Sequence, residues 1–230
     1  NFILFSSMKE PPYPQSDGNL DVKRIILLPL QNRRYRRVIL LMLIWNVGYQ
    51  LAAPFTSVYM VSKLNMGYSY ITLMLVLASI ASVVSVRYWG RLADKKSWLH
   101  LLKVMMLIQV ICYCTWFLID VNNAVFLLPI AHILGGAAIS GINISINNIQ
   151  YSFAPPENKS VYIGFSLSAN GIFGFAGTLA GSYFIKITPS FGTTVQGFSI
   201  SNMQLIFIMS AAVLAAGILG INRISGSKLN

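Results

Sequence analysis

Charge is scarce in this sequence, and negative charge is the scarcest. Charged residues make up 10% of the 230 residues, and only six of them are Asp or Glu. A soluble globular domain carries about 25% charged residues. Because 55% of the residues are hydrophobic, most of the chain is unsuited to contact with water. The composition therefore excludes an ordinary soluble domain and predicts a membrane protein.

Cysteine and catalytic motifs are also nearly absent. Cys112 and Cys114 lie two positions apart in an apolar run, where a helix points them in different directions. This spacing predicts no disulfide and no metal site, and we expect no cofactor. Neither a Gly-x-Ser-x-Gly nor a His-Glu-x-x-His pattern occurs, and the two histidines, His100 and His132, are far apart in the chain. We expect no enzyme, because a hydrolytic nucleophile needs a paired base.

What the sequence does contain is six long apolar runs. A helix of about 20 apolar residues crosses the hydrocarbon core of a bilayer. The runs are Val38–Met60, Tyr70–Tyr88, Leu99–Ile119, Ala124–Ile149, Val161–Ile185 and Met203–Ile221. They predict an all-α integral membrane protein with six transmembrane helices over residues 38–222, between a linker (1–37) and a tail (223–230). The run Ile25–Leu30 is too short to cross and is interrupted by Pro29.

Lysine and arginine are distributed unevenly around these runs. Fifteen of the 17 lie in the terminal segments, in or beside the connection between the second and third runs, or after the fourth run, and only Lys63 and Lys186 lie on the other side. Loops rich in Lys and Arg stay in the cytoplasm. We therefore predict that both termini are cytoplasmic. The same placement accounts for the net charge of +11 without nucleic acid, whose recognition requires a basic patch on a folded domain.

Predicted cytoplasmic positions are Lys23, Lys95, Asn158 and Lys228, and predicted outer positions are Asn65, Asn122 and Thr193.

The connection between the second and third runs contains a pattern that topology does not explain. Cations alone would hold this segment in the cytoplasm, yet it also carries a glycine, a small residue and an aspartate, in the order GRLADKKSW from Gly90 to Trp98. The pattern resembles the loop signature of the major facilitator superfamily. The matching residues are Gly90, Leu92, Ala93, Asp94 and Lys95. The departures are Ser97 and Trp98, which stand where that signature has a second glycine and a basic residue.

The resemblance implies an architecture and a function. The incomplete loop pattern corresponds to the C-terminal half of a twelve-helix fold, so the six runs would be helices seven to twelve. Residues 1–37 would then be the end of a preceding helix plus the central loop. The implied function is a secondary active transporter that moves a small solute by alternating access, in the cell membrane. Its partners would be the lipid bilayer and the N-terminal half of the same transporter.

The resemblance also implies a role for the loop itself. Gly90, Arg91, Asp94 and Lys95 would form a conformational latch, in which Asp94 accepts hydrogen bonds from the N-terminus of a neighbouring helix, for example near Ser160. The alternative is that Asp94 is a solvated acid among cations.

Polar residues inside the runs predict where a solute binds. Lipid cannot satisfy such groups, so they face the bundle or a watery cavity. The fourth run carries one polar face, and the first run carries another; in this family those two helices line the central cavity. The predicted cavity residues are Asn46, Tyr49, Gln50, His132, Ser140, Asn143 and Asn147. The alternatives are interhelical packing for the asparagines and a hydrogen-bonded structural role for His132.

Two further features bear on mechanism. None of the six acidic residues lies inside a run, so no carboxylate proton relay is visible. Gly171, Gly174, Gly177 and Gly181 in the fifth run predict close approach to a neighbouring helix. The neutral polar faces favour an uncharged hydroxylated or amphiphilic solute. Two other functions stay open: a six-span protein that works as a homodimer, and a membrane receptor that does not transport.

Overall fold

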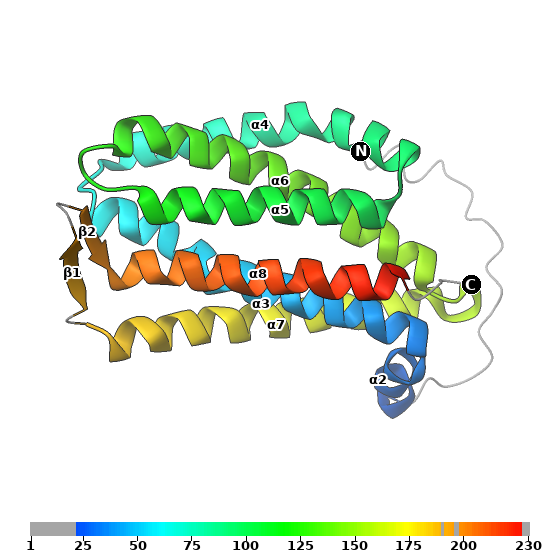
Figure 1. Ribbon diagram of the computed structural model, residues 1–230. Coiled ribbons are helices and arrows are strands. Elements are labelled where there is room, and N and C mark those ends of the chain that lie inside the picture. Colours follow the sequence, from blue (N-terminus) through cyan, green and yellow to red (C-terminus); the bar gives the residue numbers. More distant parts are fainter. Residues whose placement is uncertain (1–21, 190, 196–197, 227–230) are drawn as a thin grey trace, which may run out of the picture.

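The structure is a computed structural model that describes residues 22–189, 191–195 and 198–226, so the first 21 residues of the predicted linker and Lys228 lie outside the described residues. Within these ranges the chain forms a bundle of long helices with a short two-stranded hairpin at one end (Figure 1). In chain order the elements are α2 (Val22–Gln31), α3 (Arg33–Ser62), α4 (Tyr68–Lys95), α5 (Trp98–Leu118), α6 (Ala124–Phe153), the 3₁₀ helix η1 (Pro156–Asn158), α7 (Lys159–Ile187), β1 (Gly192–Val195), β2 (Phe198–Ser201) and α8 (Asn202–Gly226).

All six predicted transmembrane runs form helices that are long and apolar enough to cross a membrane. The helices extend past the apolar runs at their ends. For example, α3 and α6 have 30 residues each, which at 1.5 Å per residue exceeds the roughly 30 Å of a hydrocarbon core. The chain is therefore an integral multi-pass membrane protein with an all-α fold.

Helix boundaries follow from local hydrogen bonds. Asn32 begins α3, because its side-chain oxygen accepts from the backbone N–H groups of Arg34 and Tyr35, both at 3.0 Å. Ser97 begins α5 in the same way, by accepting from the N–H of His100 at 3.1 Å. Only two residues, Lys96 and Ser97, therefore separate α4 from α5.

The segment Gly90–Lys95 is helical, which corrects the prediction that it forms a loop. It makes up the last turns of α4, which ends only at Lys95. Nothing in the segment breaks a helix outright, and a lysine in the last turn is favourable for the helix dipole. The short connection to α5 then leaves the charged residues on the end of a rigid helix.

The helices pack as two groups of three. The helices α4, α5 and α6 form one group, while α3, α7 and α8 form the other, and α8 joins the two by packing on α5. Phe207 of α8 lies at the centre of this junction, with its ring against those of Tyr59, Tyr113 and Trp116. Gln204 of the same helix donates to the carbonyls of Phe117 and Ile119 at 2.9 and 3.1 Å, which ties α8 to the end of α5.

The two helices α4 and α7 lie on opposite sides of the bundle and are the least buried (Figure 1). Only 11% of the apolar window of α4 and 22% of that of α7 are buried, against 44% for α3, α5 and α8. Most of their exposed residues are apolar, including Val83 and Phe175. Lipid or another protein surface must cover them in the membrane.

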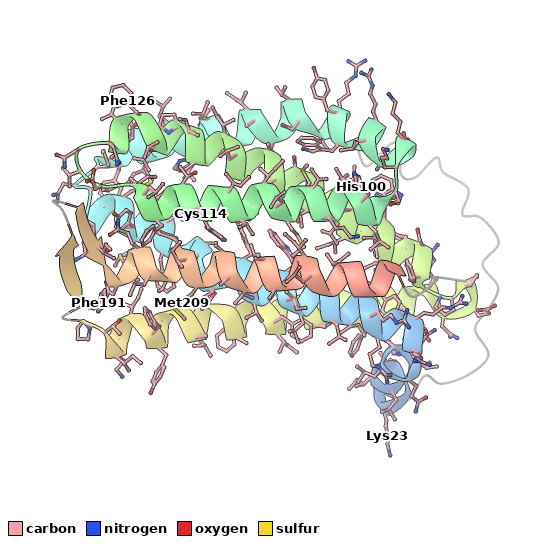
Figure 2. All side chains as sticks on the ribbon, in the orientation of Figure 1. Lys23, His100, Cys114, Phe126, Phe191 and Met209 are labelled. Carbon is pink, nitrogen blue, oxygen red and sulfur yellow. The ribbon has the colours of Figure 1, made fainter. Side chains whose placement is uncertain are left out.

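The connections segregate to the two ends of the bundle, as the charge pattern predicts. The α4–α5 and α6–α7 connections and α2 lie at one end, and the α3–α4 connection, the α5–α6 connection and the hairpin lie at the other (Figure 1). Nitrogen-bearing side chains gather at the first end, where Lys23 and His100 lie (Figure 2). Lys63 and Lys186 lie at the ends of α3 and α7 that face the hairpin.

The helix α2 occupies part of the segment predicted as a linker. Its axis is turned away from the bundle axis, beside the ends of α3 and α7 (Figure 1). It has 10 residues and contains Pro29, so it is too short to cross a bilayer, as predicted for Ile25–Leu30.

Candidate functional site: a cavity between four helices

A cavity of about 140 Å³ lies between α3, α4, α5 and α6. Its wall is largely aromatic and apolar, with a few neutral polar groups. The lining residues are Tyr49, Ala53, Thr56, Leu75, Ala78, Gln109, Cys112, Tyr113, Trp116, Ala131, His132, Gly135, Gly136 and Ile139. None of these described residues is Asp, Glu, Lys or Arg. Polar anchors in an apolar wall are typical of sites for small organic molecules.

His132 is held in one tautomer by its own helix. Its Nδ1 lies 2.8 Å from the carbonyl oxygen of Leu128, one turn earlier in α6. A carbonyl only accepts, so Nδ1 carries the proton and Nε2 of the neutral ring is left as an acceptor. The ring also packs on Trp116, with the ring centres 5.4 Å apart, and is buried. His132 therefore presents a fixed acceptor next to an aromatic surface.

Gln109 brings an unsatisfied amide oxygen to the same cavity. The residue is 2% exposed, and its Oε1 has no hydrogen-bond partner within the described part of the chain. A buried amide oxygen without a partner costs about 1–3 kcal/mol. It is the only amide side chain in α5, a helix that is otherwise strongly apolar. A solute donor is one way to satisfy this oxygen.

Tyr49 and Tyr113 connect α3 and α5 beside the cavity. The hydroxyl of Tyr113 donates to the backbone carbonyl of Tyr49 at 2.9 Å. Tyr49 stacks on Trp45, with the ring centres 5.0 Å apart. Tyr49 also lines the cavity, so its hydroxyl is a candidate hydrogen-bonding group for a solute.

Of the three predicted cavity residues in α3, one lines the cavity and two do not. Tyr49 lines the cavity, but Asn46 and Gln50 face α7 instead. The Asn46 amide donates to the side-chain oxygen of Asn170 and to the carbonyl of Met42. Gln50 packs against Gly174 and Gly177, near enough that a Cβ at Gly174 would lie 3.4 Å from its Cγ. These two side chains join α3 to α7, which is the packing role that intramembrane amides also serve.

The predicted cavity residues of α6 lie at different levels along the helix, and only one of them lines the cavity. His132 lines the cavity, while Ser140 is half-buried and donates to the carbonyl of Ala137 at 2.9 Å. Asn143 and Asn147 are exposed. The spacing of positions 132, 136, 143 and 147 places them on one side of the helix. The polar stripe therefore runs from the cavity towards the end of the bundle where α2 lies.

The predicted latch residues lie apart from the cavity, at the end of α4. Arg91, Asp94 and Lys95 are exposed there, and α4 and α7 lie on opposite sides of the bundle (Figure 1). Trp89, one turn earlier, fastens this part of α4, because its indole N–H donates to the carbonyl of Ala137 at 2.9 Å.

Sequence reasoning missed the contribution of α5 to the wall. Gln109, Cys112, Tyr113 and Trp116 all face the cavity from a helix whose sequence shows no polar face. The lone amide at Gln109 was the available signal, since a polar side chain inside a transmembrane helix faces protein or a cavity.

The polar groups of the cavity wall are neutral side chains. Among the described residues, no group of three His, Cys, Asp or Glu is placed to hold a metal ion. The acceptors at His132 and Gln109, and the hydroxyl of Tyr49, suit hydroxyl or amide groups as hydrogen-bonding partners. The rings of Trp116 and Tyr113 suit an apolar part of the same molecule.

Two comparisons with known proteins bear on this site. The family model described as Major Facilitator Superfamily matches residues 2–178, which is more than half of the chain. No curated protein matches the chain.

Proposed function

The chain belongs to the major facilitator superfamily, a transporter family, and on that premise we propose that it is the C-terminal half of a secondary active transporter. The solute is small and uncharged, and it binds in the cavity between α3, α4, α5 and α6. Both chain termini face the cytoplasm of a cell whose plasma membrane holds the protein. The N-terminal half of the same transporter completes the solute pathway.

The observation that carries the proposal is the composition of the cavity wall. An ion would require a charged or oxygen-rich site, and the described wall has no ionised carboxylate, Lys or Arg. It instead combines an unpartnered amide oxygen at Gln109, a fixed acceptor at His132 and the Tyr49 hydroxyl. A solute that donates hydrogen bonds to these groups restores partners that the empty wall lacks.

The exposed faces of the bundle support a second half. The helices α4 and α7 flank the bundle on opposite sides and bury little of their apolar surface within it. Polar Asn143 and Asn147 are exposed on α6, and polar groups are unfavourable against lipid. A second six-helix unit that packs on the exposed side of α6 shields both asparagines from lipid. It leaves a polar path between the two halves.

Alternating access then requires the two halves to move against each other around the site. Repeats in such transporters carry the solute near the middle of the membrane. His132 and Gln109 lie in the interior of α6 and α5 rather than at their ends, which suits this position.

A homodimer of six-span chains is the second candidate, favoured by the same exposed surface of α4 and α7. The mass of the purified full-length protein in native mass spectrometry, read together with the sequence upstream of Asn1, separates the two candidates. Six further spans upstream in a monomer support the half-transporter. Two identical six-span chains contradict it.

Transport is tested with the full-length protein in proteoliposomes. Uncharged solutes that raise its melting temperature are then offered as transport substrates. Tyr49→Phe removes one hydroxyl from the cavity, and the loss of one hydrogen bond of about 0.5–1.5 kcal/mol raises KM by about three- to tenfold. Tyr183→Phe, on the exposed surface of α7, is the matched control and leaves KM unchanged. An equal KM for wild type and Tyr49→Phe contradicts the solute site.

A further inference from the structure

The short helix α2 has one docked face and one bare apolar face. Leu28 is half-buried and Pro29 is buried, so this side of α2 packs on the bundle. Ile26, Leu27 and Leu30 are 47%, 39% and 37% exposed on the other side. Three large aliphatic side chains on the outside of a 10-residue helix are unfavourable in water. Some apolar environment must receive them.

A pair of tyrosines holds α2 in place. The hydroxyl of Tyr162 on α7 donates to the backbone carbonyl of Leu28 at 3.2 Å. The hydroxyl of Tyr35 on α3 lies 3.0 Å from the carbonyl of Tyr162 and 2.5 Å from the Ser166 hydroxyl oxygen, and the two rings meet edge to face. The contacts between the tyrosines are buried and the bond to Leu28 is part-buried, so α2 is attached to α7 at a defined point. Its bare side therefore has a defined direction.

The position of α2 matches the boundary of a bilayer. It lies beside the ends of α3 and α7, with its axis turned from theirs, where the apolar part of α3 begins at Val38 (Figure 1). An amphipathic helix at this level places its aliphatic residues at the boundary between headgroups and acyl chains. A helix of this length cannot enter more deeply without leaving its ends unsatisfied.

Positive charge follows directly after α2 in the chain. Arg33, Arg34 and Arg36 are exposed in the first turn of α3, one residue beyond the end of α2. Exposed arginines next to a surface helix attract anionic headgroups and bind phosphate with two N–H groups at once. The apolar side chains and the arginines thus match the two layers of one anionic lipid surface.

We propose that α2 and the arginines that follow it form a binding site for anionic phospholipid. Ile26, Leu27 and Leu30 insert among the acyl chains, and Arg33, Arg34 and Arg36 bind the headgroup phosphates. The tyrosine pair holds this site against α7. Occupancy of the site therefore depends on the lipid composition of the leaflet that contacts this end of the bundle.

The test uses the full-length protein with Cys112 and Cys114 replaced by alanine and a polarity-sensitive fluorophore at Leu27→Cys. The protein is placed in nanodiscs of phosphatidylcholine alone, or with phosphatidylserine, each with and without lipids that carry a nitroxide on the acyl chain. Glu157→Cys, exposed in η1 at the same end of the bundle, is the matched control. Both leaflets of a nanodisc have the same composition, so the result does not depend on orientation or on transport.

We expect the label at position 27 to emit at shorter wavelength and to be quenched by the nitroxide, about twofold more with phosphatidylserine than without it. Replacing Arg33, Arg34 and Arg36 by glutamine removes the added quenching, and inorganic phosphate does not substitute for the lipid. The control label stays accessible to iodide. Two results in nanodiscs overturn the proposal: iodide reaches the label at position 27 in both lipid mixtures, or nitroxide quenching is equal in the two mixtures. A third result also overturns it: the label is already fully shielded in detergent and is not quenched by the nitroxide lipids, which indicates that protein covers this face.

Discussion

Gly136 of α6 lies directly against the backbone carbonyl of Ala78 in α4. A Cβ at position 136 would lie 2.1 Å from that oxygen, which is far inside van der Waals contact. Both residues also line the cavity. This close contact between α4 and α6 is therefore part of the cavity wall, so a change in this packing is also a change in the cavity.

Gly136→Ala should destabilise the protein and impair solute binding together. The oxygen that the new methyl group meets belongs to the backbone, so no side-chain rotation relieves the clash and the helices must separate. Overpacking of this kind costs about 1–3 kcal/mol. Melting temperature in detergent measures the effect. Gly220→Ala in α8 is the control, because a Cβ there meets nothing within 4 Å and gains up to about 1 kcal/mol of helix propensity. Equal melting temperatures for the two variants contradict the contact.

Gln109→Leu should separate binding from stability. The substitution removes a buried oxygen that has no partner, so the melting temperature stays equal or rises. If the amide binds solute, affinity falls by about tenfold, as expected for a lost hydrogen bond near the upper end of the normal range. Gln150→Leu is the matched control, because its Nε2 is also buried and unpartnered but lies outside the cavity. If Gln109→Leu lowers the melting temperature but leaves the affinity for solute unchanged, the Gln109 amide stabilises the fold and does not bind solute.

Asn143→Ala should raise the KM for transport and leave the melting temperature unchanged. The side chain is exposed on α6, so its removal disturbs no packing within the described bundle. The loss of one amide contact changes KM by about three- to tenfold. Asn148→Ala is the control, since that amide already donates to the carbonyl of Ile144 at 2.8 Å. A lower melting temperature with unaltered solute affinity assigns Asn143 to packing against the other half.

Asp94→Asn should slow transport without loss of expression. The change removes the charge and keeps the shape of an exposed side chain. A charge-assisted hydrogen bond of about 1.5–3 kcal/mol in one conformation shifts a two-state population at least tenfold. Initial rates in proteoliposomes measure the effect, with Glu157→Gln, exposed at the same end, as the control. Wild-type kinetics in Asp94→Asn exclude a latch at this residue.

Single-cysteine labelling should place the two ends of the bundle on opposite sides of the membrane. In intact cells, an impermeant reagent should label cysteines at Asn65 and Asn122 but not at Lys95 or Asn158, after removal of Cys112 and Cys114. The uneven distribution of Lys and Arg is the reason for this direction. Asn65 and Asn122 are both exposed in the structure, so lack of labelling does not reflect burial. Labelling at Lys95 from outside the cell reverses the orientation.

The six long helices could be predicted from the sequence because the interactions that form each helix lie within that helix. Each helix satisfies its own backbone hydrogen bonds in lipid, so length and hydropathy suffice to predict it. The uneven distribution of Lys and Arg along the sequence correctly indicated which connections share an end of the bundle. Glycine spacing predicted that the fifth run approaches a neighbouring helix closely, and in the structure that neighbour is α3: a Cβ at Gly181 would lie 2.4 Å from the carbonyl oxygen of Leu51. Gly171, in contrast, has no neighbour within 4 Å of an added Cβ.

The end of α4 and the segment before α3 were harder to predict, because charged residues at helix ends look like loops. Charge lowers hydropathy over Gly90–Lys95, but it does not break a helix that continues from a long apolar run. The amphipathic helix α2 was likewise assigned to a linker, since its apolar run is short. It is fastened by a hydrogen bond from the hydroxyl of Tyr162, which is 134 positions from Leu28 in the sequence.

The sequence by itself determined the membrane class, the six helices and the candidate polar residues, because hydropathy and charge act within one helix. Only the tertiary structure decided which of those residues share a cavity. Tyr49 and Asn46 are neighbours on one helix, yet Tyr49 lines the cavity while Asn46 bonds Asn170 of α7. The direction of a side chain is fixed by its own helix, but its partner is fixed by how that helix is rotated against the others. That rotation depends on contacts between distant segments, such as Gly136 with Ala78.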